Sequence, residues 1–129
     1  MGSSYGLIEV SGVVAAVDSL DAMCKAADVS LVTWERKLGG RLVTLIVTGN
    51  VSAVTAAVES AKEQCIKKPC ATAVIANPHP ETVRLAELSA KRLEKNTKTA
   101  QTAKTPARKP AAKKPTNTQN TQKATEGDK

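Results

Sequence analysis

With 129 residues, 41% of them hydrophobic, the chain has room for one domain, and its core must be aliphatic because Phe is absent and there is one Trp and one Tyr. The formal net charge of +7 would favour a nucleic-acid or membrane partner, yet residues 1–95 carry only +1 of it and residues 96–129 carry +6. No apolar run approaches the roughly 18 residues of a membrane-spanning helix, and three cysteines are too few for a disulfide framework. We therefore expect a soluble cytoplasmic protein with no membrane partner.

The first elements in the chain are a strand and a helix. Residues 7–10 form a short extended apolar run, and from residue 13 to residue 27 the apolar positions recur at helical spacing. Asp21 and Lys25 lie on the other face of this helix, at the i,i+4 separation that favours an ion pair.

A hairpin and a second helix follow. Residues 29–36 and 41–47 are rich in β-branched and other apolar side chains, and the short glycine-containing segment between them is typical of a hairpin tip. Asn50 then provides an N-cap for a helix over residues 51–65, whose apolar residues keep to one face.

The last ordered elements are a strand over residues 71–76 and a helix. A rigid turn at residues 77–80 puts Pro80 at the first position of this helix, which runs through Leu93. The element order is thus βαββαβα in an α/β domain covering residues 1–95. Residues 96–129 are Lys, Thr, Ala, Pro, Gln and Asn with almost no large apolar side chain, which predicts a disordered basic tail.

Four stretches of the sequence resemble the bacterial microcompartment (BMC) shell domain. They are residues 6–12, 15–29, 40–54 and 74–81, which read GLIEVSG, AAVDSLDAMCKAADV, GRLVTLIVTGNVSAV and VIANPHPE. Each alone would be weak evidence, because apolar strands and Ala-rich helices are common, but the four occur in order and at the right spacing. The resemblance covers residues 5 to about 90.

This resemblance implies a ferredoxin-like fold with an antiparallel four-stranded sheet. It also implies cyclic hexamers that tile into a shell around a pathway's enzymes, with the loop after the second strand forming a central pore for small polar metabolites. The loop here is one residue longer than the commonest pattern, and in this it is similar to a minor ethanolamine-utilisation shell protein that has a C-terminal extension. The implied pore residues are Lys37, Leu38, Gly39, Gly40 and Arg41.

The resemblance also implies which residues join neighbouring hexamers. Lys25 falls at the position of an edge lysine, with the alternative that it is a solvated lysine paired with Asp21. Asn77 stands where many major shell proteins have an Arg, and His79 matches the Pro-His that follows it. Because Asn has fewer donors than Arg, we expect a specialised subunit. One alternative is therefore a non-hexameric or hetero-assembling subunit whose basic tail binds cargo enzymes or nucleic acid.

No arrangement of residues predicts catalysis, a metal or a cofactor. The sole histidine, His79, lies between prolines, and no carboxylate pair or Ser/His/Asp set has a suitable spacing. Cys65 and Cys70 are more simply core or interface thiols than metal ligands. The element order also fits an RNA-binding domain, but that function needs aromatic side chains on the central strands, and residues 7–10 and 42–47 have none.

Overall fold

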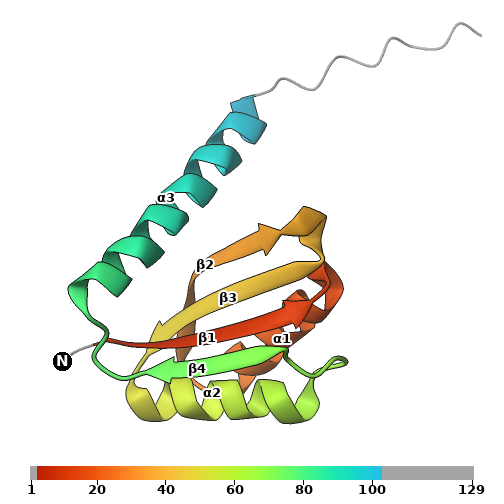
Figure 1. Ribbon diagram of the computed structural model, residues 1–129, viewed down its shortest axis with the longest axis vertical. Helices are drawn as coiled ribbons and strands as arrows, with labels where there is room; N and C mark the ends of the chain where they lie inside the picture. Colours follow the sequence, from red (N-terminus) through yellow and green to blue (C-terminus); the bar gives the residue numbers. More distant parts are fainter. Residues whose placement is uncertain (1–2, 103–129) are drawn as a thin grey trace, which may run out of the picture.

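The computed structural model describes residues 3–102, apart from the side chains of Lys37, Leu38 and residues 99–102. Its elements follow the predicted βαββαβα order, with one 3₁₀ turn, η1, in the loop between the second and third strands (Figure 1). Their bounds are β1 Ser4–Ser11, α1 Val13–Ala26, β2 Val29–Lys37, η1 Leu38–Gly40, β3 Leu42–Gly49, α2 Val51–Gln64, β4 Ala71–Ile75 and α3 Pro80–Thr102.

The four strands form one antiparallel sheet in the order β2-β3-β1-β4, which confirms the ferredoxin-like fold. At one end of the sheet Ser11 pairs with Leu42, which pairs in turn with Lys37 at the end of β2. At the other end Ser4 pairs with Gly49, which pairs with Val29 at the start of β2. This register fixes where each loop leaves the sheet.

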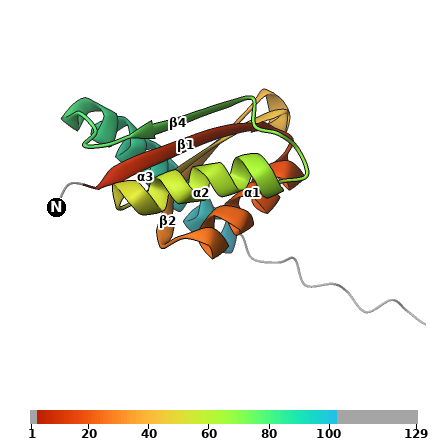
Figure 2. The ribbon, with the colours of Figure 1, turned by 90° about the horizontal axis from the view of Figure 1, so that it is seen from below.

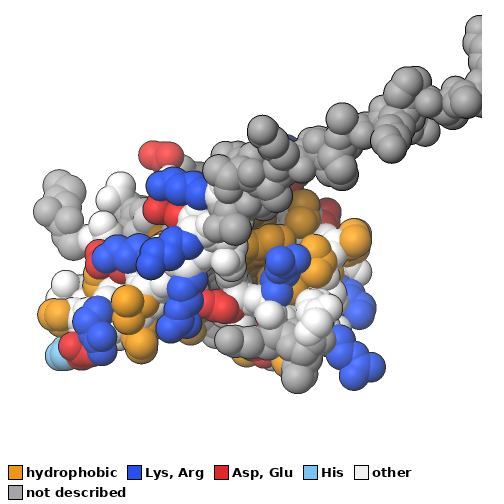
Figure 3. All heavy atoms as spheres, turned by 90° about the horizontal axis from the view of Figure 1, so that it is seen from above, with side chains coloured by type: hydrophobic (Ala, Val, Ile, Leu, Met, Phe, Trp, Pro, Cys, Tyr) orange, Lys and Arg blue, Asp and Glu red, His pale blue; other side chains and the backbone are white. Residues whose placement is uncertain are grey.

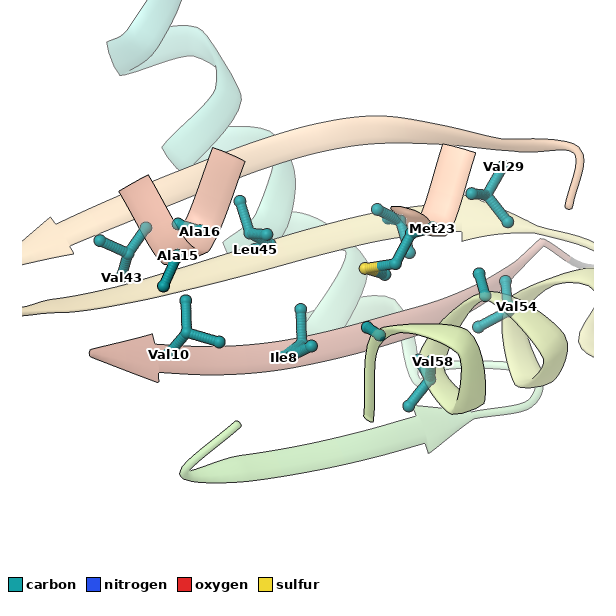
Figure 4. Close-up of a cluster of buried hydrophobic side chains, with 13 residues drawn as sticks. Ile8, Val10, Ala15, Ala16, Met23, Val29, Val43, Leu45, Val54 and Val58 are labelled. Atoms are coloured by element: carbon teal, nitrogen blue, oxygen red, sulfur yellow. The ribbon is translucent and has the colours of Figure 1, made fainter. Parts of the chain in front are cut away.

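Helices α1 and α2 lie side by side on one face of the sheet, and the core fills the space between the two layers (Figure 2). Figure 4 shows Ile8, Val10 and Leu45 of the central strands directed toward side chains of both helices. As the composition predicted, this core is aliphatic and small-chained. Its members are Ile8, Val10, Ala15, Ala16, Met23, Val29, Val43, Leu45, Val47, Val54, Ala57, Val58 and Ala61.

The helix starts agree with the sequence signals, with one exception in detail. Asn50 is the N-cap of α2, but its side chain makes no capping hydrogen bond there. Pro80 opens α3, where its fixed φ suits the first helical turn and its missing N–H costs nothing. The backbone N–H of Glu81 is instead satisfied by Nδ1 of His79, at 3.2 Å.

Helix α3 differs most from the prediction, since it continues to Thr102 and not to residue 95. No Gly or Pro occurs between Pro80 and Pro106, so nothing in the backbone stops the helix where the large apolar residues end. The predicted tail from residue 103 onward lies outside the described residues. Within residues 3–102, no helix is both long enough and apolar enough to cross a membrane.

Candidate functional site

The β2–β3 loop is a tight backbone turn at one end of the sheet. Gly39 (φ 66°) and Gly40 (φ 88°) both occupy the left-handed region that side chains with a Cβ disfavour. A Cβ on Gly39 would meet nothing within 4 Å, whereas one on Gly40 would lie 2.9 Å from Cγ2 of Val13. The backbone N–H of Gly12 donates to the carbonyl of Arg41 at 3.0 Å, which fixes the loop against the start of α1.

Two arginines, Arg36 and Arg41, flank this loop. Arg41 is exposed, while the side chains of the two other predicted pore residues that precede the glycines, Lys37 and Leu38, lie outside the described ones. Sequence reasoning missed Arg36, whose guanidinium lies 5.0 Å from the centroid of the Trp34 ring. Arg36 also lines a hollow of about 320 Å³ together with Val13 and the two loop glycines. The signal available in the sequence was its position two residues after Trp34 and directly before Lys37.

Lys25 lies at the end of α1 that is remote from this loop. Its ammonium group is exposed and forms the predicted i,i+4 ion pair with Asp21. The hydrogen bond from Lys25 to Asp21, together with the attraction of that carboxylate, raises the pKa of Lys25 above its ordinary 10.5. The pairing with Asp21 is therefore confirmed, and the role of Lys25 at a hexamer edge stays a prediction.

Asn77 and His79 lie in the turn between β4 and α3. Asn77 has φ 54°, a left-handed conformation that Asn tolerates better than most residues. Both side chains are exposed, and His79 accepts the hydrogen bond from Glu81 described above. The turn therefore presents polar groups at the surface while it redirects the chain into α3.

The loop and the turn lie at opposite ends of the sheet (Figure 1). Ile75, the last residue of β4, pairs with Tyr5 near the start of β1, whereas the loop flanks the pair formed by Ser11 and Leu42. Ser4 and Ser11 are seven positions apart along β1, or about 23 Å at the usual rise of a strand. Because α1 runs back along the sheet from residue 13, Lys25 lies at the same end as the turn.

On the second face of the sheet, α3 packs against β2. Leu7 and Glu9 of β1 lie there beside Thr44 and Ala73, around a hollow of about 210 Å³. No aromatic side chain lines this hollow.

The thiols and carboxylates of residues 3–102 were the candidate ligands for a metal ion. No three His, Cys, Asp or Glu side chains in this part of the chain are grouped to hold a metal ion. The three thiols are free, and only Cys65 packs against the core, whereas Cys24 and Cys70 are exposed. Cys65 is therefore a core thiol, and a place for Cys70 in an interface between subunits stays a prediction.

Comparisons with known proteins identify the family. The family model for the BMC domain matches residues 4–78. The chain is 41% identical over 83 residues to the probable carboxysome shell protein CsoS1E of Prochlorococcus marinus. The aligned region covers 62% of this chain and 40% of that protein. It is 42% identical over 83 residues to the carboxysome shell protein CsoS1A of Hydrogenovibrio crunogenus, covering 62% of this chain and 85% of that one.

A solved structure agrees with these matches. It is the crystal structure of a microcompartment protein from Desulfitobacterium hafniense, which superimposes on this chain with a TM-score of 0.60 and a sequence identity of 26%. The superposition covers 69% of this chain and 49% of that one. The chain thus spans less than half of this structure and of CsoS1E, but most of CsoS1A. The two relatives named are carboxysome proteins, so the finer resemblance to the ethanolamine-utilisation protein stays a prediction.

The matched proteins are shell proteins and not enzymes, in agreement with the absence of catalytic motifs from the sequence. Proteins of this family assemble with themselves and with other shell proteins. The chain therefore belongs to the BMC-domain family and is a shell protein of a bacterial microcompartment.

Proposed function

We propose that six copies of the chain form a ring that tiles into the shell, with residues 37–41 of each copy around a central pore for small polar metabolites. One observation carries the proposal: the loop and the turn at residues 77–80 lie at opposite ends of the sheet, about 23 Å apart. A subunit of a ring needs this division, because one of its ends faces the axis and the other faces the neighbouring ring.

The flanks of the subunit also support assembly into a ring. Val14 and Val17 on α1 are 74% and 54% exposed, and Leu31 on β2 is 39% exposed. Val14 and Val17 are three residues apart and so lie on the same side of their helix. Apolar side chains gathered in this way are stabilised when another protein surface covers them, and a second copy of the chain would supply that surface.

The charge of the loop predicts what would pass through the pore. Arg41 is exposed at the loop, and six-fold repetition would bring six guanidinium groups close to the axis. Cations concentrated around a narrow opening favour anions and hinder cations. Replacement of Lys37 and Arg41 by Glu should reverse the ion preference of reconstituted rings, whereas Lys67→Glu with Lys68→Glu, outside the loop, should leave it unchanged. An ion preference that survives the loop replacement would remove these side chains from the mechanism.

Contacts between neighbouring rings would involve Lys25, Asn77 and His79. All three side chains are exposed in the single chain, as such contacts require. With Asn at position 77 the contact has fewer donors than an Arg would provide, so sheets of identical rings should be weak. Asn77→Arg should therefore extend the two-dimensional sheets seen by electron microscopy. Unchanged sheets would exclude this residue from the contact.

The oligomeric state tests the ring directly. Size-exclusion chromatography with light scattering should give a mass six times the 13.5 kDa of the chain. A chain that stays monomeric at all concentrations and salt conditions would contradict the homohexamer and favour a subunit that assembles only with other shell proteins.

The charge distribution supports a second role, in which the basic tail binds an acidic cargo protein or nucleic acid. Residues 96–129 carry eight Lys or Arg and two acidic residues, while residues 1–95 are nearly neutral. Binding through such a segment weakens steeply with salt. A full-length variant with Lys104, Lys109, Lys113 and Lys114 replaced by Gln should lose affinity for single-stranded nucleic acid in a gel-shift assay. Affinity equal to that of the unmodified chain would exclude the tail as the binding segment.

A further inference from the structure

A hollow of about 220 Å³ lies between β2 and the second half of α3. One wall is formed by Trp34, Glu35 and Arg36, and the other includes Ser89 and Arg92. By the share of volume that water takes in the liquid, the hollow could hold about seven water molecules or one small metabolite with a few waters. Figure 3, which looks onto α3 from above, shows Lys and Arg side chains interspersed with carboxylates along this helix.

The two arginines of this hollow have free donors. The guanidinium of Arg36 is held 5.0 Å from the centroid of the Trp34 ring, and a stacked guanidinium keeps its N–H groups directed outward in its own plane. Among the described residues, neither Arg36 nor Arg92 forms a hydrogen bond or ion pair with another side chain. The hollow is therefore lined by two planar cations that no other described side chain pairs.

Two other polar groups of the hollow, Ser89 and Glu35, are hydrogen-bonded to each other. Ser89 donates its hydroxyl hydrogen to Glu35, and the hydroxyl of Thr33, which is fully buried, lies 2.9 Å from Oγ of Ser89. Because Ser89 has one hydrogen and gives it to Glu35, Thr33 must be the donor in its own contact with Ser89. This chain of hydrogen bonds positions the carboxylate of Glu35 in the wall. The ionised side chains of the hollow then add up to one net positive charge, from two arginines and one glutamate.

We propose that this hollow binds a small metabolite with a single carboxylate, held between Arg36 and Arg92. A guanidinium matches a carboxylate in planar, bidentate geometry, and one net positive charge in the walls balances one negative charge on the ligand. The carboxylate of Glu35 opposes a second negative charge. The site lies within one chain, so it does not depend on the proposed ring or its pore.

Trp34 is the only tryptophan of the chain and lines the hollow, so its fluorescence reports on binding there. Acetate added to the full-length protein at constant ionic strength should change the emission of Trp34 in a saturable way, with a dissociation constant of about 1–10 mM. Inorganic phosphate, which carries more charge at neutral pH, should bind more weakly.

The decisive comparison is between two neighbouring exposed cations of α3. Arg92→Gln removes a guanidinium of the hollow and should weaken acetate binding by about tenfold. Lys91→Gln removes the same charge one residue away, at a side chain that does not line the hollow, and should leave the affinity unchanged. Arg36→Gln alters the surroundings of Trp34, so acetate binding by this variant is measured by calorimetry and not by fluorescence. Its affinity for acetate should fall about as much as that of Arg92→Gln.

Three results would overturn the proposal. The first is the absence of saturable binding of acetate by the unmodified protein. The second is an equal loss in Lys91→Gln and Arg92→Gln, which would reduce the effect to general screening of charge. The third is tighter binding of phosphate than of acetate, which would contradict a site for a single negative charge. Equal unfolding midpoints of the two α3 variants would show that both retain the fold.

Discussion

The two glycines of the β2–β3 loop allow the cost of backbone conformation to be separated from the cost of a steric contact. Both have positive φ, but only a Cβ on Gly40 would meet another atom, Cγ2 of Val13 at 2.9 Å. Gly39→Ala should therefore lower the free energy of unfolding by about 1–2 kcal/mol, the usual cost of left-handed backbone in a residue with a Cβ. Gly40→Ala should add an overpacking cost of about 1–3 kcal/mol to a similar conformational cost.

Removal of the blocking methyl groups gives the control for this comparison. In a Val13→Ala background, Gly40→Ala should become nearly as mild as Gly39→Ala, because the close contact is gone and only the φ cost remains. The assay is urea unfolding of all variants at one protein concentration, since dissociation of an oligomer would contribute to the measured free energy. Equal losses for the two single substitutions, or a difference that persists without the Val13 methyls, would refute the steric argument.

Three further predictions address the elements around the loop and the sheet. Ser89→Ala leaves the buried hydroxyl of Thr33 without its partner and should lower the free energy of unfolding by about 1–3 kcal/mol; a loss below about 0.5 kcal/mol by urea titration would contradict this. Asp21→Asn should lower the pKa of Lys25 toward 10.5 in an NMR titration, and an unchanged pKa would exclude Asp21 as the cause of the raised value. The raised pKa stabilises the fold below pH 10.5, and this gain is lost as the pH rises through the pKa of the folded state. Val17→Asp should shift the light-scattering mass toward the monomer if this flank joins neighbouring copies, whereas an unchanged mass would exclude Val17 from the contact.

Local sequence patterns predicted the element order because each element carries its own periodicity. The strand predicted at residues 7–10 extends in the structure over Ser4–Ser11, since Ser4 and Tyr5 are buried by packing that no local pattern reveals. The hairpin tip predicted at residues 37–40 overlaps the observed turn Leu38–Gly40, because two adjacent glycines between apolar runs are a local signal. Those glycines do adopt positive φ, as their lack of a Cβ allows.

The hollow between β2 and α3 could not be predicted in the same way. Arg36 and Arg92 are far apart in sequence, and only the docking of α3 against β2 brings them to one cavity. The extension of α3 was missed for a different reason. Composition indicated that residues after 95 bury no core, but a helix that has already started can continue through polar residues at little cost until a Gly or Pro intervenes.

The electrostatic character of the loop is set locally and not by the net charge of the chain. Arg36, Lys37 and Arg41 give the loop and its approach three cations against the single carboxylate of Glu35, although residues 1–95 together carry only +1. At physiological ionic strength the Debye length is about 8 Å, so charges at the far end of the sheet, about 23 Å away, are largely screened from the loop. The residues that would set the proposed preference for anions are therefore those of the loop itself and its copies around the proposed ring. Glu35 belongs to the residues that set the charge of the loop as well. The hydroxyl of Ser89 on α3 donates a hydrogen bond to its carboxylate and holds it at the side of the strand. The position of α3 therefore contributes to the charge that the loop presents.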